Sequence, residues 1–201
     1  MKTLWFVLLL VASTAFVLLG CSDNSTQPVS PADQSAQPPP SPAKQISTLF
    51  TFTDQPIAPL SGGSLTLRGG VWQSKDRHIV EIFASSDPYV AGIMEEDFST
   101  TIDAVTGEGP FHGKWKITPS NTVLTGGGSW EGTLEGYRTG PNQDGTWSAI
   151  VKAIGHGKGG TIDGWKITST TDLTIYPSPT PPPFPLFAGW IGKGNGYYFQ
   201  H

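Results

Sequence analysis

Hydrophobic and polar residues alternate along three stretches in the middle of the chain. Residues 111–118 read FHGKWKIT, residues 130–137 read WEGTLEGY and residues 146–155 read TWSAIVKAIG. In each stretch every second residue is aromatic, aliphatic or glycine, and the residues between are mostly charged or hydroxyl-bearing. A period of two places successive side chains on opposite faces of an extended strand. Each stretch is therefore predicted to be a β-strand with one buried face.

Turn-forming residues separate these strands. VTGEGP, TGGG and PNQDG lie between the alternating stretches, and glycine, asparagine and aspartate adopt turn conformations at low cost. Closure removes the exposed edges of such a meander, and about eight strands enclose an interior that side chains fill or that holds one small ligand. The predicted fold is all-β: a single antiparallel up-and-down β-barrel of about seven or eight strands. Further strands are predicted at residues 47–53, 64–72, 78–84 and 90–103 and in the TIDGWKITS segment that begins at Thr161.

Several tryptophans fall within the predicted barrel. Most share a strand face with aliphatic residues, so we expect them to pack in the core rather than to stack on a sugar or an aromatic ligand. They are Trp72, Trp115, Trp130, Trp147 and Trp165.

The chain begins with the layout of a secretory signal peptide. Lys2 precedes an uncharged, mostly apolar run to Gly20, which is slightly short of the roughly 20 apolar residues of a membrane-spanning helix. The run ends in LLGC at residues 18–21, which resembles the lipobox of bacterial lipoproteins. The resemblance implies cleavage before Cys21 and attachment of a diacylglycerol to its thiol. Cys21 is the only cysteine in the chain, so no intramolecular disulfide competes for it.

We therefore expect residues 1–20 to be a signal peptide and the mature protein to be exported and held on a membrane by its lipid. Ser22 stands where lipoproteins retained in the inner membrane of enteric-type bacteria carry Asp. By that analogy the expected location is the outer membrane, if the organism has one.

Proline-rich segments flank the predicted domain. Residues 21–45 are rich in Pro, Ser and Gln and are expected to form a disordered tether. Residues 177–185 read PSPTPPPFP, which interrupts strands and helices alike, and an aromatic, glycine-rich tail follows. We place the barrel at residues 46–176 and the linker and tail at 177–201. The tail either folds back on the surface of the domain or docks a partner.

Four motifs follow one another in a recognisable order: SDPYVAG, DAVTGEGPFHGKWKI, GGSWEGTLEG and AIGHGKGGTIDGWKI. Over about residues 65–168 they resemble a group of bacterial exported domains of unknown role, which look like the allene oxide cyclase and dirigent type of barrel. The resemblance implies that fold. It implies no activity, because no catalytic residue of allene oxide cyclase matches a position in this chain.

The GHGKGG segment at residues 155–160 has the glycine spacing of a dinucleotide-binding loop. Such a loop must open a helix, whereas a β-branched, alternating segment follows here, and Lys158 precedes Gly159 rather than the Ser or Thr of a P-loop. We therefore expect no nucleotide cofactor. A shared metal site for the three histidines of the domain is also not expected, since one shares a face with lysines and another lies in a predicted glycine turn. They are His78, His112 and His156.

Two groups of carboxylates are candidates for acid–base chemistry. Glu95, Glu96 and Asp97 are consecutive, which is typical of a solvated hairpin segment, and Glu131 and Glu135 lie opposite an apolar strand face and are expected to point outward. Neither group predicts a catalytic site. The formal net charge of −4, without a basic stripe, argues against nucleic acid as a partner.

The sequence favours a lipid-anchored protein of the cell envelope whose barrel binds or scaffolds without catalysis. One alternative is a barrel enzyme of isomerase or cyclase type acting on a small hydrophobic substrate, and another is a protein that docks a partner through its aromatic tail. The partners expected are the membrane, through lipidated Cys21, a small hydrophobic ligand in the barrel, and another envelope protein. A filled interior would contradict ligand binding and catalysis, whereas a cavity with two or three converging polar groups would favour the enzyme.

Overall fold

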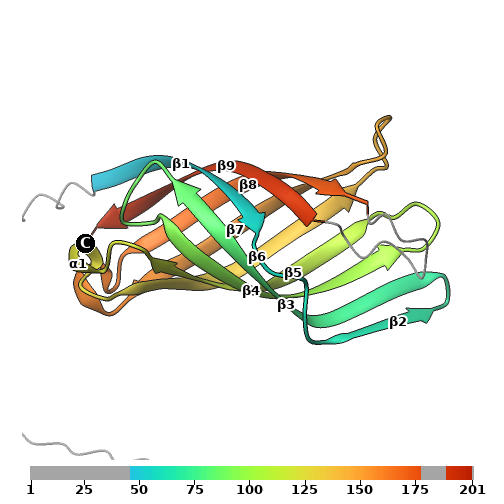
Figure 1. Ribbon diagram of the computed structural model, residues 1–201, viewed down its shortest axis with the longest axis horizontal. Coiled ribbons are helices and arrows are strands. Elements are labelled where there is room, and N and C mark those ends of the chain that lie inside the picture. Colours follow the sequence, from blue (N-terminus) through green and yellow to red (C-terminus); the bar gives the residue numbers. More distant parts are fainter. Residues whose placement is uncertain (1–45, 178–188, 201) are drawn as a thin grey trace, which may run out of the picture. The chain divides into compact units, whose positions relative to one another are not determined.

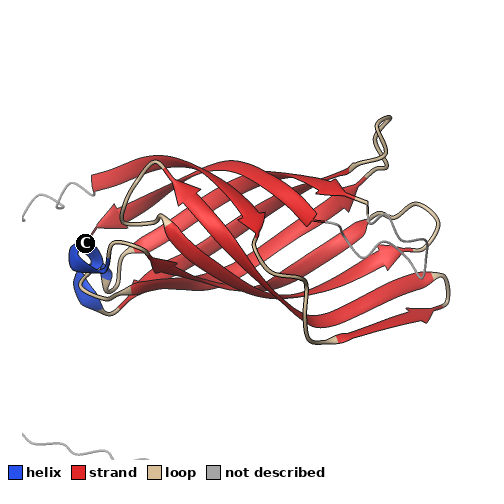
Figure 2. Cartoon of the chain, viewed as in Figure 1, coloured by secondary structure: helices blue, strands red, loops and turns tan. Residues whose placement is uncertain are grey.

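The computed structural model describes residues 46–177 and 189–200. Most of these residues lie in antiparallel strands (Figure 2). The strands are β1 (Ile46–Pro56), β2 (Ser64–Arg68), β3 (Val71–Ser85), β4 (Gly92–Asp103), β5 (Gly109–Pro119), β6 (Ser129–Thr139), β7 (Trp147–Lys158), β8 (Lys166–Tyr176) and β9 (Gly189–Gln200), with a short helix α1 (Thr122–Thr125) and a 3₁₀ turn η1 (Gly160–Ile162).

The strands form one sheet that closes on itself. Their order is β1-β9-β8-β7-β6-β5-β4-β3-β2, and β1 also pairs with β3. Eight strands thus make a closed antiparallel barrel, and β2 pairs with β3 outside it (Figure 1). The predicted all-β, antiparallel barrel is confirmed.

Strand β1 completes the barrel by pairing on both of its edges. Residues from Ile46 to Asp54 pair with β9, and residues from Phe52 to Pro56 pair with β3. Strand β3 is long enough to pair with two strands along one edge. Its second half pairs with β1 and closes the barrel, and its first half pairs with β2. A register shift between Ser74 and Arg77, where Asp76 has a φ of 53°, separates the two halves.

The placement of the C-terminal tail outside the barrel domain is wrong. The segment forms β9, which pairs with β1 along one edge and β8 along the other. Three consecutive inward positions of β9, between Trp190 and Tyr198, are glycines, and a Cβ atom on any of the three would overlap a side chain of β1. Side chains of β1, two of them aromatic, therefore pack directly on the glycine backbone of β9 where these two strands pair. The facing pairs are Gly192 with Asp54, Gly194 with Phe52, and Gly196 with Phe50.

The end of the barrel that carries α1 is filled by an aromatic cluster, which we define as Tyr89, Trp130, Trp165 and Tyr198. The rings of Trp165 and Tyr198 are stacked with centroids 5.4 Å apart. The indole Nε1 of Trp130 donates a hydrogen bond of 2.8 Å to the carbonyl oxygen of Tyr89, and Trp130 has no exposed surface. This end is closed by side chains.

The predicted core role of the tryptophans is confirmed for Trp115 and Trp130, which are buried. Trp72, Trp147 and Trp165 are half-buried. Glycine positions on facing strands accommodate the large rings, as Gly155 does for Trp115, where a Cβ would lie 2.6 Å from the indole.

Residues 1–45 and 178–188 lie outside the described residues. They include the predicted signal peptide, Cys21, Ser22, the tether and most of the proline-rich linker. Among the helices in the described part of the chain, none has the length and apolar character needed to cross a membrane.

Candidate functional site

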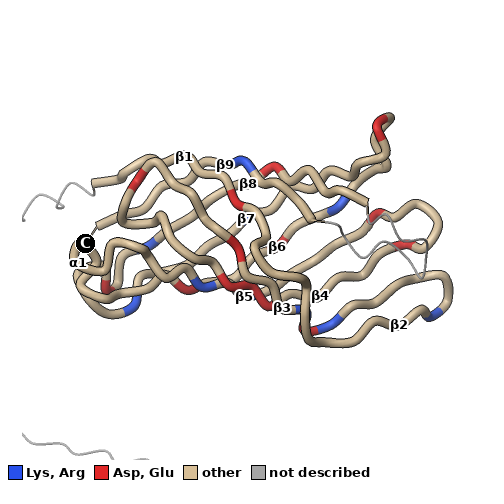
Figure 3. Tube along the Cα trace, in the orientation of Figure 1, with Lys and Arg blue, Asp and Glu red and all other residues tan. Residues whose placement is uncertain are grey.

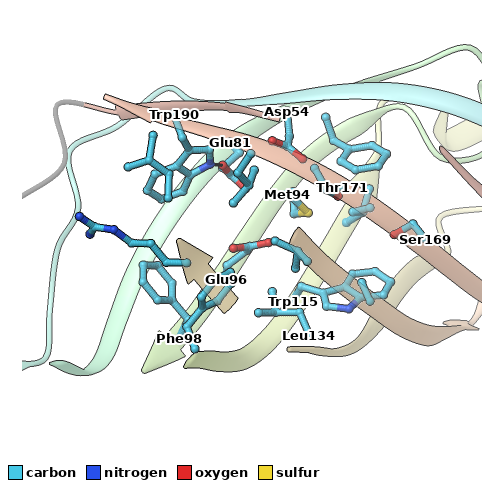
Figure 4. A pocket seen from close by; sticks show the side chains of 18 of the residues that line it. Asp54, Glu81, Met94, Glu96, Phe98, Trp115, Leu134, Ser169, Thr171 and Trp190 are labelled. Atoms are coloured by element: carbon cyan, nitrogen blue, oxygen red, sulfur yellow. Dashed lines mark hydrogen bonds between the residues drawn. The ribbon is translucent and has the colours of Figure 1, made fainter. Parts of the chain in front are cut away.

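The barrel interior holds a cavity of about 80 Å³. Every barrel strand contributes to its wall, and the wall is mostly apolar, with aromatic side chains such as Phe98, Trp115 and Trp190 (Figure 4). None of the four members of the aromatic cluster lines it. The volume suffices for several waters or for part of a small organic molecule, since one water needs roughly 10–15 Å³.

Three carboxyl groups point into this apolar cavity: Asp54 from β1, Glu81 from β3 and Glu96 from β4 (Figure 4). The register explains why they meet. Asp54 pairs with Phe83 across the β1–β3 seam, two residues from Glu81, so Asp54 and Glu81 are diagonal neighbours on the inward face. Glu81 pairs with Met94 on β4, two residues from Glu96, and so the diagonal continues.

The carboxyl groups differ in the donors available to them. Asp54 is 4% exposed and Glu81 is 1% exposed. The indole Nε1 of Trp190, on β9, donates a hydrogen bond to Oε1 of Glu81. The backbone N–H of Gly192 donates to the carboxyl group of Asp54. The Oδ1 atom of Asp54 nevertheless has no hydrogen-bond partner among the described residues. A buried acceptor without a donor is unfavourable.

Burial raises the pKa values of all three groups because the charged form loses its hydration. The pKa of Asp54 rises to about 7 from 3.8, although the Gly192 N–H opposes the rise. The pKa of Glu96 rises to about 8 from 4.5, through burial and then through the charge of Asp54. Burial, followed by the charges of Glu96 and Asp54, raises the pKa of Glu81 well above its usual range. The cluster therefore changes its protonation state near neutral pH.

One cation also lines the cavity. Arg138 of β6 is 2% exposed, and its guanidinium carbon lies 4.3 Å from the centroid of the Trp147 ring. Burial lowers the pKa of Arg138 to about 10, so the group remains charged at neutral pH. Asp54, Glu81, Glu96 and Arg138 are the titratable side chains in the described wall of the cavity.

The expectation that Glu95, Glu96 and Asp97 form a solvated segment is wrong for the middle residue. Glu95 and Asp97 are exposed on the outside of β4, and Asp97 contacts His78 with 2.9 Å between Oδ1 and Nδ1. Consecutive residues of a strand point to opposite faces, so Glu96 points inward with Met94 and Phe98. These apolar residues two positions away were the signal in the sequence.

The outward orientation predicted for Glu131 and Glu135 is confirmed. Glu135 is exposed, and Glu131 lies 3.2 Å from Nζ of Lys158 on the outside of the barrel. Basic and acidic residues are spread over several strands of the described chain (Figure 3).

The histidines do not come together. His78, His112 and His156 belong to β3, β5 and β7, and the last two are exposed. Within residues 46–177 and 189–200, no group of three or more His, Cys, Asp or Glu side chains is arranged to hold a metal ion.

The GHGKGG segment is mostly strand rather than turn. Its first four residues end β7, where His156 pairs with Glu131 and Lys166, so the assignment of His156 to a glycine turn is wrong. The turn comes at Gly159 and Gly160, whose φ angles of 72° and 60° suit glycine, and it leads through η1 into β8.

No protein-family model, curated protein or solved structure matches the chain.

Proposed function

We propose that this protein binds one small, largely apolar molecule inside its barrel and orients it through the three inward carboxyl groups. The observation that carries the proposal is the cavity itself, because two buried carboxyl groups, Asp54 and Glu81, and the half-buried Glu96 converge on space that apolar walls surround. Concave, mostly apolar pockets with a few convergent polar groups are characteristic of small-molecule sites.

The alternative of a purely structural core is less consistent with these side chains. Burying a carboxyl group without full hydrogen bonding costs stability, and an aliphatic residue at the same inward position would not. Asp54 and Glu81 occupy positions flanked by Phe52, Ile79 and Phe83 on the same strand faces. Polar groups that oppose folding at otherwise apolar positions are most readily explained by a function.

Binding can be tested with benzyl alcohol as an uncharged probe. Trp115 and Trp190 line the cavity, so their fluorescence should change as the probe enters, and calorimetry gives the affinity. Ala153→Phe fills the cavity from β7 and should abolish the fluorescence change. Lys152→Phe places the same ring on the outside of β7, where Lys152 is exposed, and should leave binding unchanged. Equal binding by both variants would show that the probe occupies some other site.

Anchoring to the cell envelope is the second part of the proposal, and it rests on the LLGC sequence and the single cysteine. The Cys21→Ala variant should move from the membrane fraction to the soluble fraction, while Ser25→Ala should remain with the membrane. Retention of Cys21→Ala in the membrane fraction would overturn lipid anchoring and leave the cavity proposal untouched.

A second candidate function is acid–base catalysis of isomerase or cyclase type, which a cavity with converging polar groups favours. The pKa values of about 7 for Asp54 and about 8 for Glu96 favour it, because near neutral pH one carboxyl group can act as base while the other acts as acid. A test is the exchange of the α-hydrogens of cyclohexanone in D₂O, followed by NMR. Catalysed exchange that Glu96→Gln abolishes would support this candidate, and exchange at the buffer rate would contradict it.

A further inference from the structure

We infer that the molecule held in the barrel is a small organic cation, a protonated amine whose ammonium group lies among Asp54, Glu81 and Glu96 and whose apolar body lies against the aromatic wall. This inference rests on the proposed function and specifies the chemistry of the ligand.

The first argument is the imbalance between acceptors and donors. Each ionised carboxylate offers about four acceptor positions. The donors to these groups in the described part of the chain include Trp190 Nε1, which donates to Glu81, and the Gly192 N–H, which donates to Asp54. Oδ1 of Asp54 is buried without a donor. A ligand that supplies N–H donors satisfies these oxygens, and an ammonium group supplies three.

The second argument is charge. Three acidic groups and one guanidinium line the cavity, so the site carries excess negative charge when all three acids ionise. Arg138 lies on β6, with its guanidinium over Trp147, whereas the three acids lie on the consecutive barrel strands β1, β3 and β4. A carboxylate or phosphate ligand at the acids would meet like charge. A cation compensates the excess.

The third argument is the nature of the wall. Phe50, Phe83, Phe98, Trp115 and Trp190 line the same cavity as the acids. Aromatic faces attract cations through their quadrupole, and the attraction strengthens where water is excluded. Aromatic rings and carboxyl groups together therefore suit an amine that carries a hydrocarbon group better than they suit a neutral hydrocarbon.

Binding of an amine needs no reactant other than the carboxylic acids and the solvent to account for its proton. A neutral amine that enters takes the proton of a carboxylic acid, which gives an ammonium–carboxylate pair in the cavity. An amine that enters already protonated displaces the acid proton to solvent. Because the pKa values of Asp54 and Glu96 are raised to about 7 and 8, binding of an ammonium ion at pH 6.5 should release a proton, and its affinity should increase as the pH rises to about 8.

The test compares three probes of similar size and different charge with the full-length protein: benzylamine, benzyl alcohol and benzoate. Calorimetry at pH 7.5 should give a dissociation constant for benzylamine at least about tenfold lower than for benzyl alcohol, which corresponds to about 1.4 kcal/mol, and no binding of benzoate. Glu96→Gln should weaken benzylamine binding at least about tenfold and leave benzyl alcohol within about twofold. The control is Glu95→Gln, which removes the same charge from the outer face of β4 and should change neither affinity.

The outcomes separate the two proposals. Benzyl alcohol binding as tightly as benzylamine would overturn the cation inference and retain small-molecule binding. Failure of all three probes to bind would overturn both. Equal weakening by Glu95→Gln and Glu96→Gln would show that only the overall charge matters, and would also overturn the inference.

Discussion

The two halves of the barrel interior are built on the same alternation of strands and yet differ in kind. At the α1 end, Trp130 and Tyr198 fill the interior, and their polar atoms have partners, Tyr89 O for the indole and Asp87 Oδ2 for the phenol. Beyond the aromatic cluster the interior is hollow, and Asp54 Oδ1 is buried without a donor. One half is arranged for stability and the other carries groups that oppose folding. The difference indicates that the filled end stabilises the fold, whereas the buried acids of the hollow part oppose it.

The largest expected effect concerns the filled end. Trp130→Ala removes a fully buried indole and should lower the free energy of unfolding by about 3–5 kcal/mol. Chemical denaturation measures the change. A loss below about 1 kcal/mol would show that the aromatic cluster is not the stabilising half of the interior.

Ionisation of the acids in the hollow part should lower the stability of the folded protein as the pH rises. The folded-state pKa values of Asp54 and Glu96 are raised to about 7 and 8 from 3.8 and 4.5. Their protonated forms are therefore favoured in the folded state. The stability they contribute is complete below about pH 4 and is lost as the pH rises through about 7 to 8. Thermal melts between pH 5 and pH 9 should show this decline.

Two substitutions sharpen that prediction. Asp54→Asn should make the decline shallower and make the protein more stable than the wild type at pH 9, because no charge then forms at position 54. Asp172→Asn, at an exposed position of β8, should leave the profile unchanged. A wild-type profile that rises from pH 5 to pH 9 would contradict the assignment of buried, neutral acids.

A smaller effect is expected where β9 packs on β1. A Cβ atom on Gly194 would overlap the ring of Phe52 and the carbonyl oxygen of Thr170, so Gly194→Ala should cost about 1–3 kcal/mol. Asn195→Ala, on the exposed face of the same strand, should change stability by less than about 0.5 kcal/mol. Comparable losses for the two variants would mean that the glycine face is not tightly packed.

The sequence predicted the barrel because its central strands alternate large apolar residues with polar ones. It did not reveal β9, because alternation is recognised by large inward side chains, and β9 has glycines at the three inward positions between Trp190 and Tyr198. Only the facing strand explains those glycines, since Phe50 and Phe52 fill the space above them.

The carboxyl cluster could be predicted in part from the sequence. Glu81 stands two residues from both Ile79 and Phe83, and Glu96 two residues from Met94 and Phe98, so each acid shares the face of apolar residues. That pattern predicts that the acidic side chain points into the barrel. Convergence was not predictable, because it depends on the closure of β1 on β3 and on Trp190, which is 109 residues from its partner Glu81.

The position of β9 has a consequence for biosynthesis. Strand β1 is the first barrel strand to be made, and its long edge is matched by β9, the last of the described strands. Until β9 has been synthesised, a nascent chain presents two open sheet edges, on β1 and β8, which invite pairing with other chains. The contact between β1 and β9 also joins distant parts of the chain, which slows folding. A chaperone that holds the chain until its last strand is available would therefore protect the barrel at its most vulnerable stage.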